Sequence, residues 1–67
     1  MNVGENIRRI REKQGMAQCD LAQKVGVSQP MICQYERGLR GPSLQTGFLI
    51  AEVLGCTVED LMKDDAS

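Results

Sequence analysis

The sequence predicts an all-α protein built from five short helices. Between its glycines, apolar residues recur three and four positions apart, which is the spacing of one face of a helix. No stretch alternates apolar and polar residues for long enough to indicate a sheet. The glycines that separate the segments are Gly15, Gly26, Gly38, Gly41 and Gly55.

Length and composition limit what the chain can do. Its 67 residues form one domain, and a domain this small has little room for an enclosed active site. The absence of histidine excludes Ser-His and Cys-His catalysis and any zinc site with a histidine ligand. We therefore expect no enzyme, no cofactor and no metal. We expect a single domain over residues 1–63 and a short acidic disordered tail at 64–67.

Cysteine content and the lengths of apolar runs predict a cytoplasmic location. The three cysteines are an odd number and contain no Cys-x-x-Cys pair, which indicates a reducing compartment. The first residues lack the pattern of a secretory signal. The longest apolar run, 48–51, is far too short to cross a bilayer, so we expect no membrane partner.

Charge is distributed unevenly along the chain. Residues 1–49 carry seven basic and four acidic side chains, whereas residues 50–67 carry one and five. A polyanionic partner is therefore expected to contact the N-terminal two-thirds. Charge alone leaves open the simpler reading of a solvated surface with a polar end.

The first helix is expected over residues 2–14. Asn2 followed by Glu5 is typical of a capping box, and Gly15 suits a left-handed helix end. One apolar stripe along this helix consists of Val3, Ile7 and Ile10.

The second and third helices form a helix-turn-helix pattern. They are expected over about 17–24 and 28–37, joined by a glycine-containing turn. Ser28 is a good N-cap, and Pro30 falls in the first turn, where its missing N–H costs nothing. The residues expected to fill the angle between the two helices are Leu21, Val25, Val27, Ile32 and Tyr35.

Two further helices are expected near the C-terminus, one beginning near Ser43 and one capped by Thr57. Gly47 lies inside the first of these and costs roughly 1 kcal/mol relative to alanine. The spacing predicts two inner faces, Leu44, Phe48, Ala51 and Leu54 on one helix and Val58, Leu61 and Met62 on the other.

The third helix presents a polar stripe opposite its apolar one. At roughly 100° per residue, the side away from Ile32 and Tyr35 consists of Pro30, Cys33, Gln34 and Arg37. Gln29 lies at the N-terminal tip of the helix. Glutamine can hydrogen-bond adenine at N6 and N7 together, so Gln29 and Gln34 are candidates for reading bases. Outward glutamines are also common on ordinary solvated helices.

Residue patterns over most of the chain resemble the phage-repressor family, the lambda-repressor-like or XRE class. The matching stretches are 8–15 (RRIREKQG), 18–29 (QCDLAQKVGVSQ), 35–38 (YERG), 42–44 and 51–61. This resemblance covers about residues 5–62. It implies a compact five-helix bundle that binds DNA, with the helix over 28–37 in the major groove.

The resemblance also implies roles for residues beside the third helix. Gln18 matches a position that contacts phosphate and supports the first base-reading residue. Arg37 and Arg40 match positions beside the groove that contact phosphates. Arg11 and Glu36 match a structural pair that ties the first helix to the end of the third. Pro30 stands where many relatives carry a polar base-reading residue, and Gly47 where a large apolar residue is usual.

We expect a small transcriptional regulator, a repressor, that binds double-stranded DNA sequence-specifically. The alternative is a protein-interaction module or antitoxin-type partner protein with the same fold and little DNA specificity. A weak homodimer on a palindromic operator is expected through an apolar strip of Leu49, Val53 and Cys56. Alternatively, Leu49 packs inward to compensate for Gly47.

Overall fold

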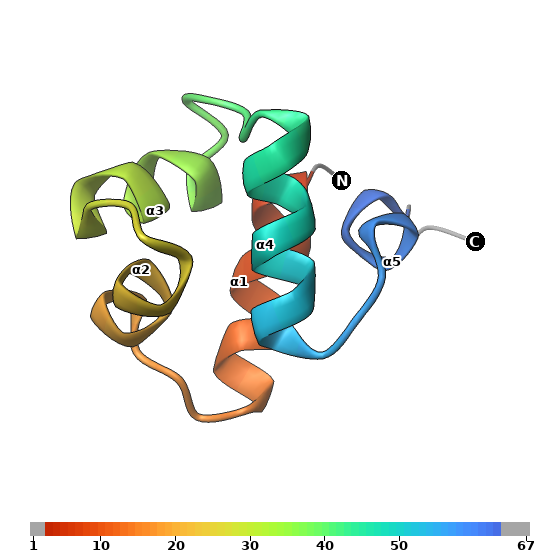
Figure 1. Cartoon of the computed structure of the whole chain (residues 1–67), viewed down its shortest axis with the longest axis horizontal. Helices are drawn as coiled ribbons and strands as arrows, with labels where there is room; N and C mark the ends of the chain where they lie inside the picture. The colour runs from red at the N-terminus through yellow and green to blue at the C-terminus, as the bar shows by residue number, and fades with distance from the viewer. Residues whose placement is uncertain (1–2, 64–67) are drawn as a thin grey trace.

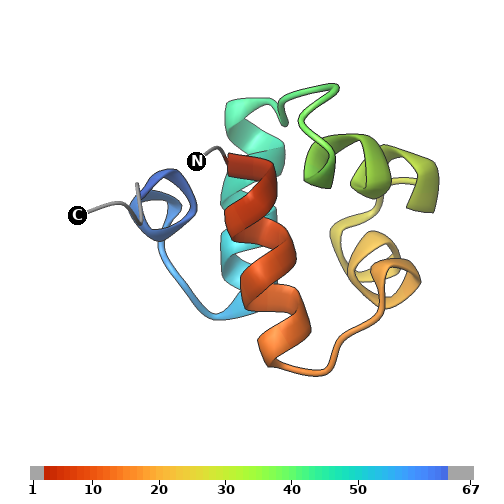
Figure 2. The ribbon, with the colours of Figure 1, turned by 180° about the vertical axis from the view of Figure 1, so that it is seen from behind.

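The structure, a computed structural model, describes residues 3–63 and contains five α-helices and no strand in that range. Two of them, α1 and α4, pack side by side in the middle, with α2 and α3 against one side and α5 on the other (Figures 1 and 2). The helices are α1 (Val3–Lys13), α2 (Gln18–Val25), α3 (Gln29–Glu36), α4 (Leu44–Leu54) and α5 (Val58–Met62). The all-α prediction is confirmed. The expected cap at Asn2 and the expected tail at 64–67 lie outside the described residues.

Three helices begin at hydroxyl caps. The side chains of Ser28, Ser43 and Thr57 each accept a hydrogen bond from the backbone N–H three residues later, at 3.1–3.2 Å. Such caps satisfy donors that the first turn of a helix leaves free. At α2 the cap is Ala17, which has no side-chain acceptor. The carboxylate of Asp20 instead accepts from the Ala17 N–H at 3.4 Å.

The predicted Thr57 cap of α5 is reciprocal in the structure. Asp60 accepts a hydrogen bond from the Thr57 N–H at 3.1 Å, which holds the pKa of its carboxyl below the ordinary value. Because the pKa is lowered in the folded state, this contribution to stability is present near neutral pH. It is lost as the pH falls through that lowered pKa.

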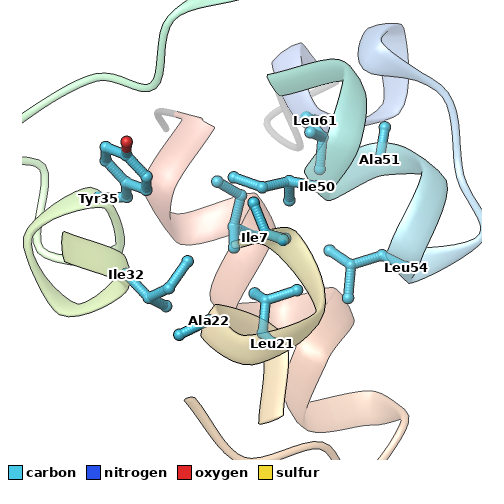
Figure 3. Packing of buried hydrophobic residues seen from close by; sticks show 10 residues of the cluster. Ile7, Leu21, Ala22, Ile32, Tyr35, Ile50, Ala51, Leu54 and Leu61 are labelled. Atoms are coloured by element: carbon cyan, nitrogen blue, oxygen red, sulfur yellow. The ribbon is translucent and has the colours of Figure 1, made fainter. Parts of the chain in front are cut away.

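The core combines at least one fully buried side chain from every helix. Ile7 of α1 lies among residues of the other four helices (Figure 3). The largest fully buried apolar side chains are Ile7, Leu21, Ile32, Ile50 and Leu61. Since these residues come from all five helices, the core fixes how the helices pack against one another.

The predicted inner face of α4 is wrong in two positions. Leu44 is 72% exposed and Phe48 is 57% exposed. The buried stripe instead consists of Gly47, Ile50, Ala51 and Leu54. At roughly 100° per residue, this stripe lies about 50° around the helix from the predicted one. The predicted face included Phe48 because its ring is the largest apolar group on the helix. The buried stripe instead centres on Ile50 and includes Gly47, which has no side chain to indicate an apolar position.

Two further apolar residues of the C-terminal third, Leu49 and Met62, are also exposed. Leu49 remains 40% exposed, so it does not pack inward to compensate for Gly47. Met62 was expected on the inner side of α5 but is 66% exposed. Leu61 is the buried residue of that short helix, because five residues make little more than one turn.

Candidate nucleic-acid interface

The turn between α2 and α3 has the geometry of a helix-turn-helix. Gly26 ends α2 with a left-handed φ of 89°, and its N–H donates to the Ala22 carbonyl at 2.8 Å. The next N–H, of Val27, donates to the same carbonyl at 3.0 Å. The angle between the helices is filled by buried Leu21, Val25, Ile32 and Tyr35, with Val27 partly buried.

The predicted reading stripe lies on the outer face of α3. Gln29, Pro30, Gln34 and Arg37 are exposed, and Cys33 is half-buried beside them. Within residues 3–63, the side chains of Gln29, Gln34 and Arg37 form no hydrogen bond or ion pair with other groups. Their amide and guanidinium groups are therefore available to an external partner. This helix lies at the edge of the molecule, as Figure 1 shows.

A buried network holds the end of α3. Arg11 of α1 donates from Nε and Nη2 to the two carboxylate oxygens of Glu36, at 2.6 and 3.1 Å. The Arg11 side chain is 9% exposed and the Glu36 side chain 2%. Arg11 also donates from Nη1 to the Met16 carbonyl at 2.6 Å. The hydrogen bond to Glu36 is the main cause that raises the pKa of Arg11 above its ordinary value.

Gln18 joins this network from the beginning of α2. Its Nε2 donates to Oε1 of Glu36 at 2.9 Å, so a single carboxylate connects α1, α2 and α3. Among the described residues, Gln18 forms no side-chain hydrogen bond with Gln29, the residue it was expected to support. Gln18 therefore contacts α3 at Glu36, the last residue of that helix, and not at Gln29, its first residue.

Two arginines stand at the C-terminal side of α3. Arg37 caps the helix, and Gly38 follows with a left-handed φ of 75°. Arg40 lies in the loop that leads to α4, exposed to solvent, with its Nη1 3.9 Å from the sulfur of Met31. A thioether is a weak acceptor, so the Arg40 guanidinium is held only loosely against α3.

Sequence reasoning missed Gly4, which sets how closely α1 approaches α3. A Cβ atom added to Gly4 would lie 1.8 Å from the carbonyl oxygen of Tyr35. The backbone of α3 thus rests directly on the first turn of α1, one residue before Glu36. The available signal was a glycine within a segment whose apolar stripe predicts a helix.

A second missed residue, Asn6, holds α5 in place. It is fully buried, and its Nδ2 donates to the carbonyls of Leu61 and Lys63, both at 2.7 Å. Its Oδ1 accepts from Nη2 of Arg9 at 3.0 Å. One amide therefore satisfies carbonyls that the end of a helix leaves free. The sequence signal is a polar residue beside the apolar stripe of α1.

The described residues contain neither a cluster suited to a metal ion nor a helix suited to a membrane. Across 3–63, no group of three cysteine or acidic side chains is arranged to hold a metal ion. Both of the longest helices described there have 11 residues, and none is long and apolar enough to span a membrane.

Known proteins resemble this chain in both sequence and structure. A family model described as helix-turn-helix matches residues 7–61. An uncharacterized HTH-type transcriptional regulator of Archaeoglobus fulgidus is 46% identical over 55 residues, which are 82% of this chain and 79% of that protein. The immunity repressor of Bacillus phage phi105 is 32% identical over 65 residues, or 97% of this chain, but this chain spans only 45% of that repressor. The P22 c2 repressor, solved in complex with a synthetic operator, superimposes with a TM-score of 0.89 at 33% identity, covering 94% of this chain and 96% of that one.

The fold and the turn geometry define a helix-turn-helix protein of the lambda-repressor type. The chain belongs to the helix-turn-helix family of transcriptional regulators. The resemblance stated from the sequence is therefore confirmed.

Proposed function

We propose that this protein is a cytoplasmic repressor that binds an operator in double-stranded DNA, with α3 in the major groove. The observation that carries the proposal is the outer face of α3. Its polar side chains have no partner among residues 3–63, while its far end is fixed by the Arg11–Glu36–Gln18 network. The P22 c2 repressor, which has the same fold, was solved with an operator.

The side chains of the interface divide between bases and phosphates. Gln29 and Gln34 have free amides that suit adenine, whereas Pro30 offers only apolar contact, for example to a thymine methyl group. Cys33 adds a small, weakly hydrogen-bonding surface beside them. Arg37 and Arg40, which are exposed, are assigned to phosphates. Gln18, at the beginning of α2, is assigned a phosphate through its backbone N–H.

This division predicts different effects for the two kinds of residue. Gln29→Ala and Gln34→Ala should each lose about 1–3 kcal/mol of binding free energy at the preferred site, with less effect on random duplexes. Arg40→Ala should weaken binding to all sequences and reduce the salt slope by about one unit. The measurement is a titration of labelled duplexes at several salt concentrations, after the preferred site has been selected from random DNA.

Gln23→Ala is the matched control, because Gln23 is an exposed glutamine on α2 that is assigned neither to the DNA nor to the dimer contact. It should leave both affinities unchanged. Equal losses on preferred and random DNA for the α3 variants would contradict the assignment of bases to the glutamines. A protein-interaction module that retained only the fold would show no salt-sensitive binding to duplex DNA.

We also propose that two copies pair weakly on a palindromic operator. One short helix contacts few base pairs. Helix-turn-helix dimers gain specificity by binding two half-sites about 34 Å apart, one turn of the DNA. The proposed contact is the strip of Leu49, Val53 and Cys56, beside which an open groove runs between α4 and α5. Glu52 and Glu59 line the same groove, and residues 44–62 contain no lysine or arginine. Like charges from two copies therefore oppose the pairing and keep it weak.

The dimer proposal predicts a selective defect in Leu49→Glu. Because Leu49 is 40% exposed, the thermal unfolding midpoint should change little. Affinity for a palindromic site should fall by about 100-fold, the usual gain from bivalent binding, while affinity for a half-site remains. Met62→Glu, which introduces the same carboxylate at an exposed apolar residue outside the strip, should retain cooperative binding. A large drop in the unfolding midpoint of Leu49→Glu would show that Leu49 belongs to the core.

A further inference from the structure

Beside Gly47 the protein contains a pocket that no side chain of residues 3–63 fills. Gly47 is buried in the middle of α4, yet a Cβ atom added to it would meet no atom within 4 Å outside its own helix. A pocket of about 300 Å³ lies at this position. It is bounded by the beginnings of α1 and α4, which lie at the same end of the bundle (Figures 1 and 2), and by α5.

The walls of this Gly47 pocket are apolar and uncharged. Its side-chain lining is Val3, Pro42, Leu44, Val58, Leu61 and Met62, together with the single hydroxyl of Ser43. That hydroxyl is already engaged, since it donates to the Thr46 hydroxyl at 3.0 Å and accepts from the Thr46 N–H. The described side chains of the lining therefore offer no free donor, acceptor or charge, so an ion or a strongly polar molecule would lose hydration there without compensation.

We propose that the Gly47 pocket binds a small uncharged apolar molecule of about the size of one or two fused rings. Its volume lies at the lower end of the range for small-molecule sites, about 300–1,000 Å³. An apolar cavity of about 150 Å³ is large enough to hold benzene. Two lining side chains, Leu44 and Met62, are largely exposed, so the pocket is open to solvent and a ligand can enter without unfolding.

The pocket shares a wall with the loop that carries Arg40. Gly41, Pro42 and Ser43 line it, and they directly follow Arg40 in the chain. A bound molecule would pack against this loop and change the position of the Arg40 guanidinium. The effect on DNA affinity rests on the proposed function, whereas binding of the molecule does not.

The test uses indole as the probe, observed by amide NMR of the whole chain without DNA. Indole should shift the amide signals of Gly41, Gly47 and Leu61 saturably, with a dissociation constant of about 1 mM or lower for a ligand of this size. Gly47→Leu, which fills the pocket, should weaken binding at least about tenfold. Gly47→Ala adds one methyl group and should still bind, and Leu49→Glu, altered on the α4–α5 groove, should bind as the wild type does.

The outcomes are distinguishable. Absence of saturable shifts, or equal shifts in Gly47→Leu, would overturn the proposal. So would a dimer that Gly47→Leu dissociates, because a side chain of the second copy would then be the occupant. With operator present, saturating indole should change the affinity of the wild type and leave that of Gly47→Leu unchanged. Loss of DNA binding in every sample would refute the proposed function and leave the indole result intact.

Discussion

Glu36→Ala is expected to lower the free energy of unfolding by about 3–5 kcal/mol, the usual cost of breaking a buried ion pair from one side. The variant leaves the Arg11 guanidinium buried with its main partner removed, and the amide of Gln18 also loses its acceptor. A domain of this size has a total stability of only about 5 kcal/mol or a little more. Urea titration at 25 °C should therefore show a large unfolded fraction before denaturant is added.

The matched variant replaces both partners of the pair. Arg11→Met with Glu36→Leu removes the two charges together and should recover most of the lost stability, since an apolar replacement of a buried pair is often neutral or better. We expect this double variant to fold but to discriminate less between operator and random DNA, because the C-terminal end of α3 loses its polar contacts with α1 and α2 and is held there by packing alone. Full discrimination in the double variant would show that the network serves stability alone.

Gly4→Ala is expected to be nearly as damaging, by about 3 kcal/mol, although it adds a single methyl group. The new Cβ would overlap the Tyr35 carbonyl, which belongs to the backbone of α3 and cannot rotate away. The first turn of α1 must therefore move away from α3, and the Arg11–Glu36 pair moves with it. Thermal unfolding followed by circular dichroism measures the loss.

Gly47→Ala is the control for this experiment. It makes the same substitution at another buried helical glycine, where the added methyl meets nothing within 4 Å. It should raise stability by about 0.5–1 kcal/mol, because alanine favours the helix and restricts the unfolded chain. If Gly4→Ala lowers the free energy of unfolding and Gly47→Ala raises it, the loss at Gly4 comes from its close packing against α3. A loss of similar size in both would contradict that explanation.

The features that the sequence predicted correctly are those with a local signal. Three helix starts are predictable because a hydroxyl cap bonds a backbone N–H only three residues away, as at Ser28, Ser43 and Thr57. The turn is likewise predictable from Gly26, because glycine adopts the left-handed φ that this helix end requires. The resemblance then supplied the contact between Arg11 and Glu36, which lie 25 residues apart.

The features that the sequence did not predict depend on contacts between distant segments. Gly4 matters because of Tyr35, and Asn6 matters because of Leu61, 55 residues away. On α4, Phe48 fits a helical stripe as well as Ile50 does, so periodicity alone could not choose between them. The choice depends on which face meets α1 and α2, and that is a property of the assembled bundle.

The amide of Asn6 also has a consequence for how the molecule opens. Helix α5 has five residues, too few to persist on its own, and its last carbonyls depend on one side chain of α1. We therefore regard α5 as a separate cooperative unit, which detaches at a lower free energy than global unfolding. Its amide protons should exchange with solvent earlier than those of α1 at the same pH. Since Val58 belongs to both the α4–α5 groove and the Gly47 pocket, each of these surfaces exists only while α5 is docked.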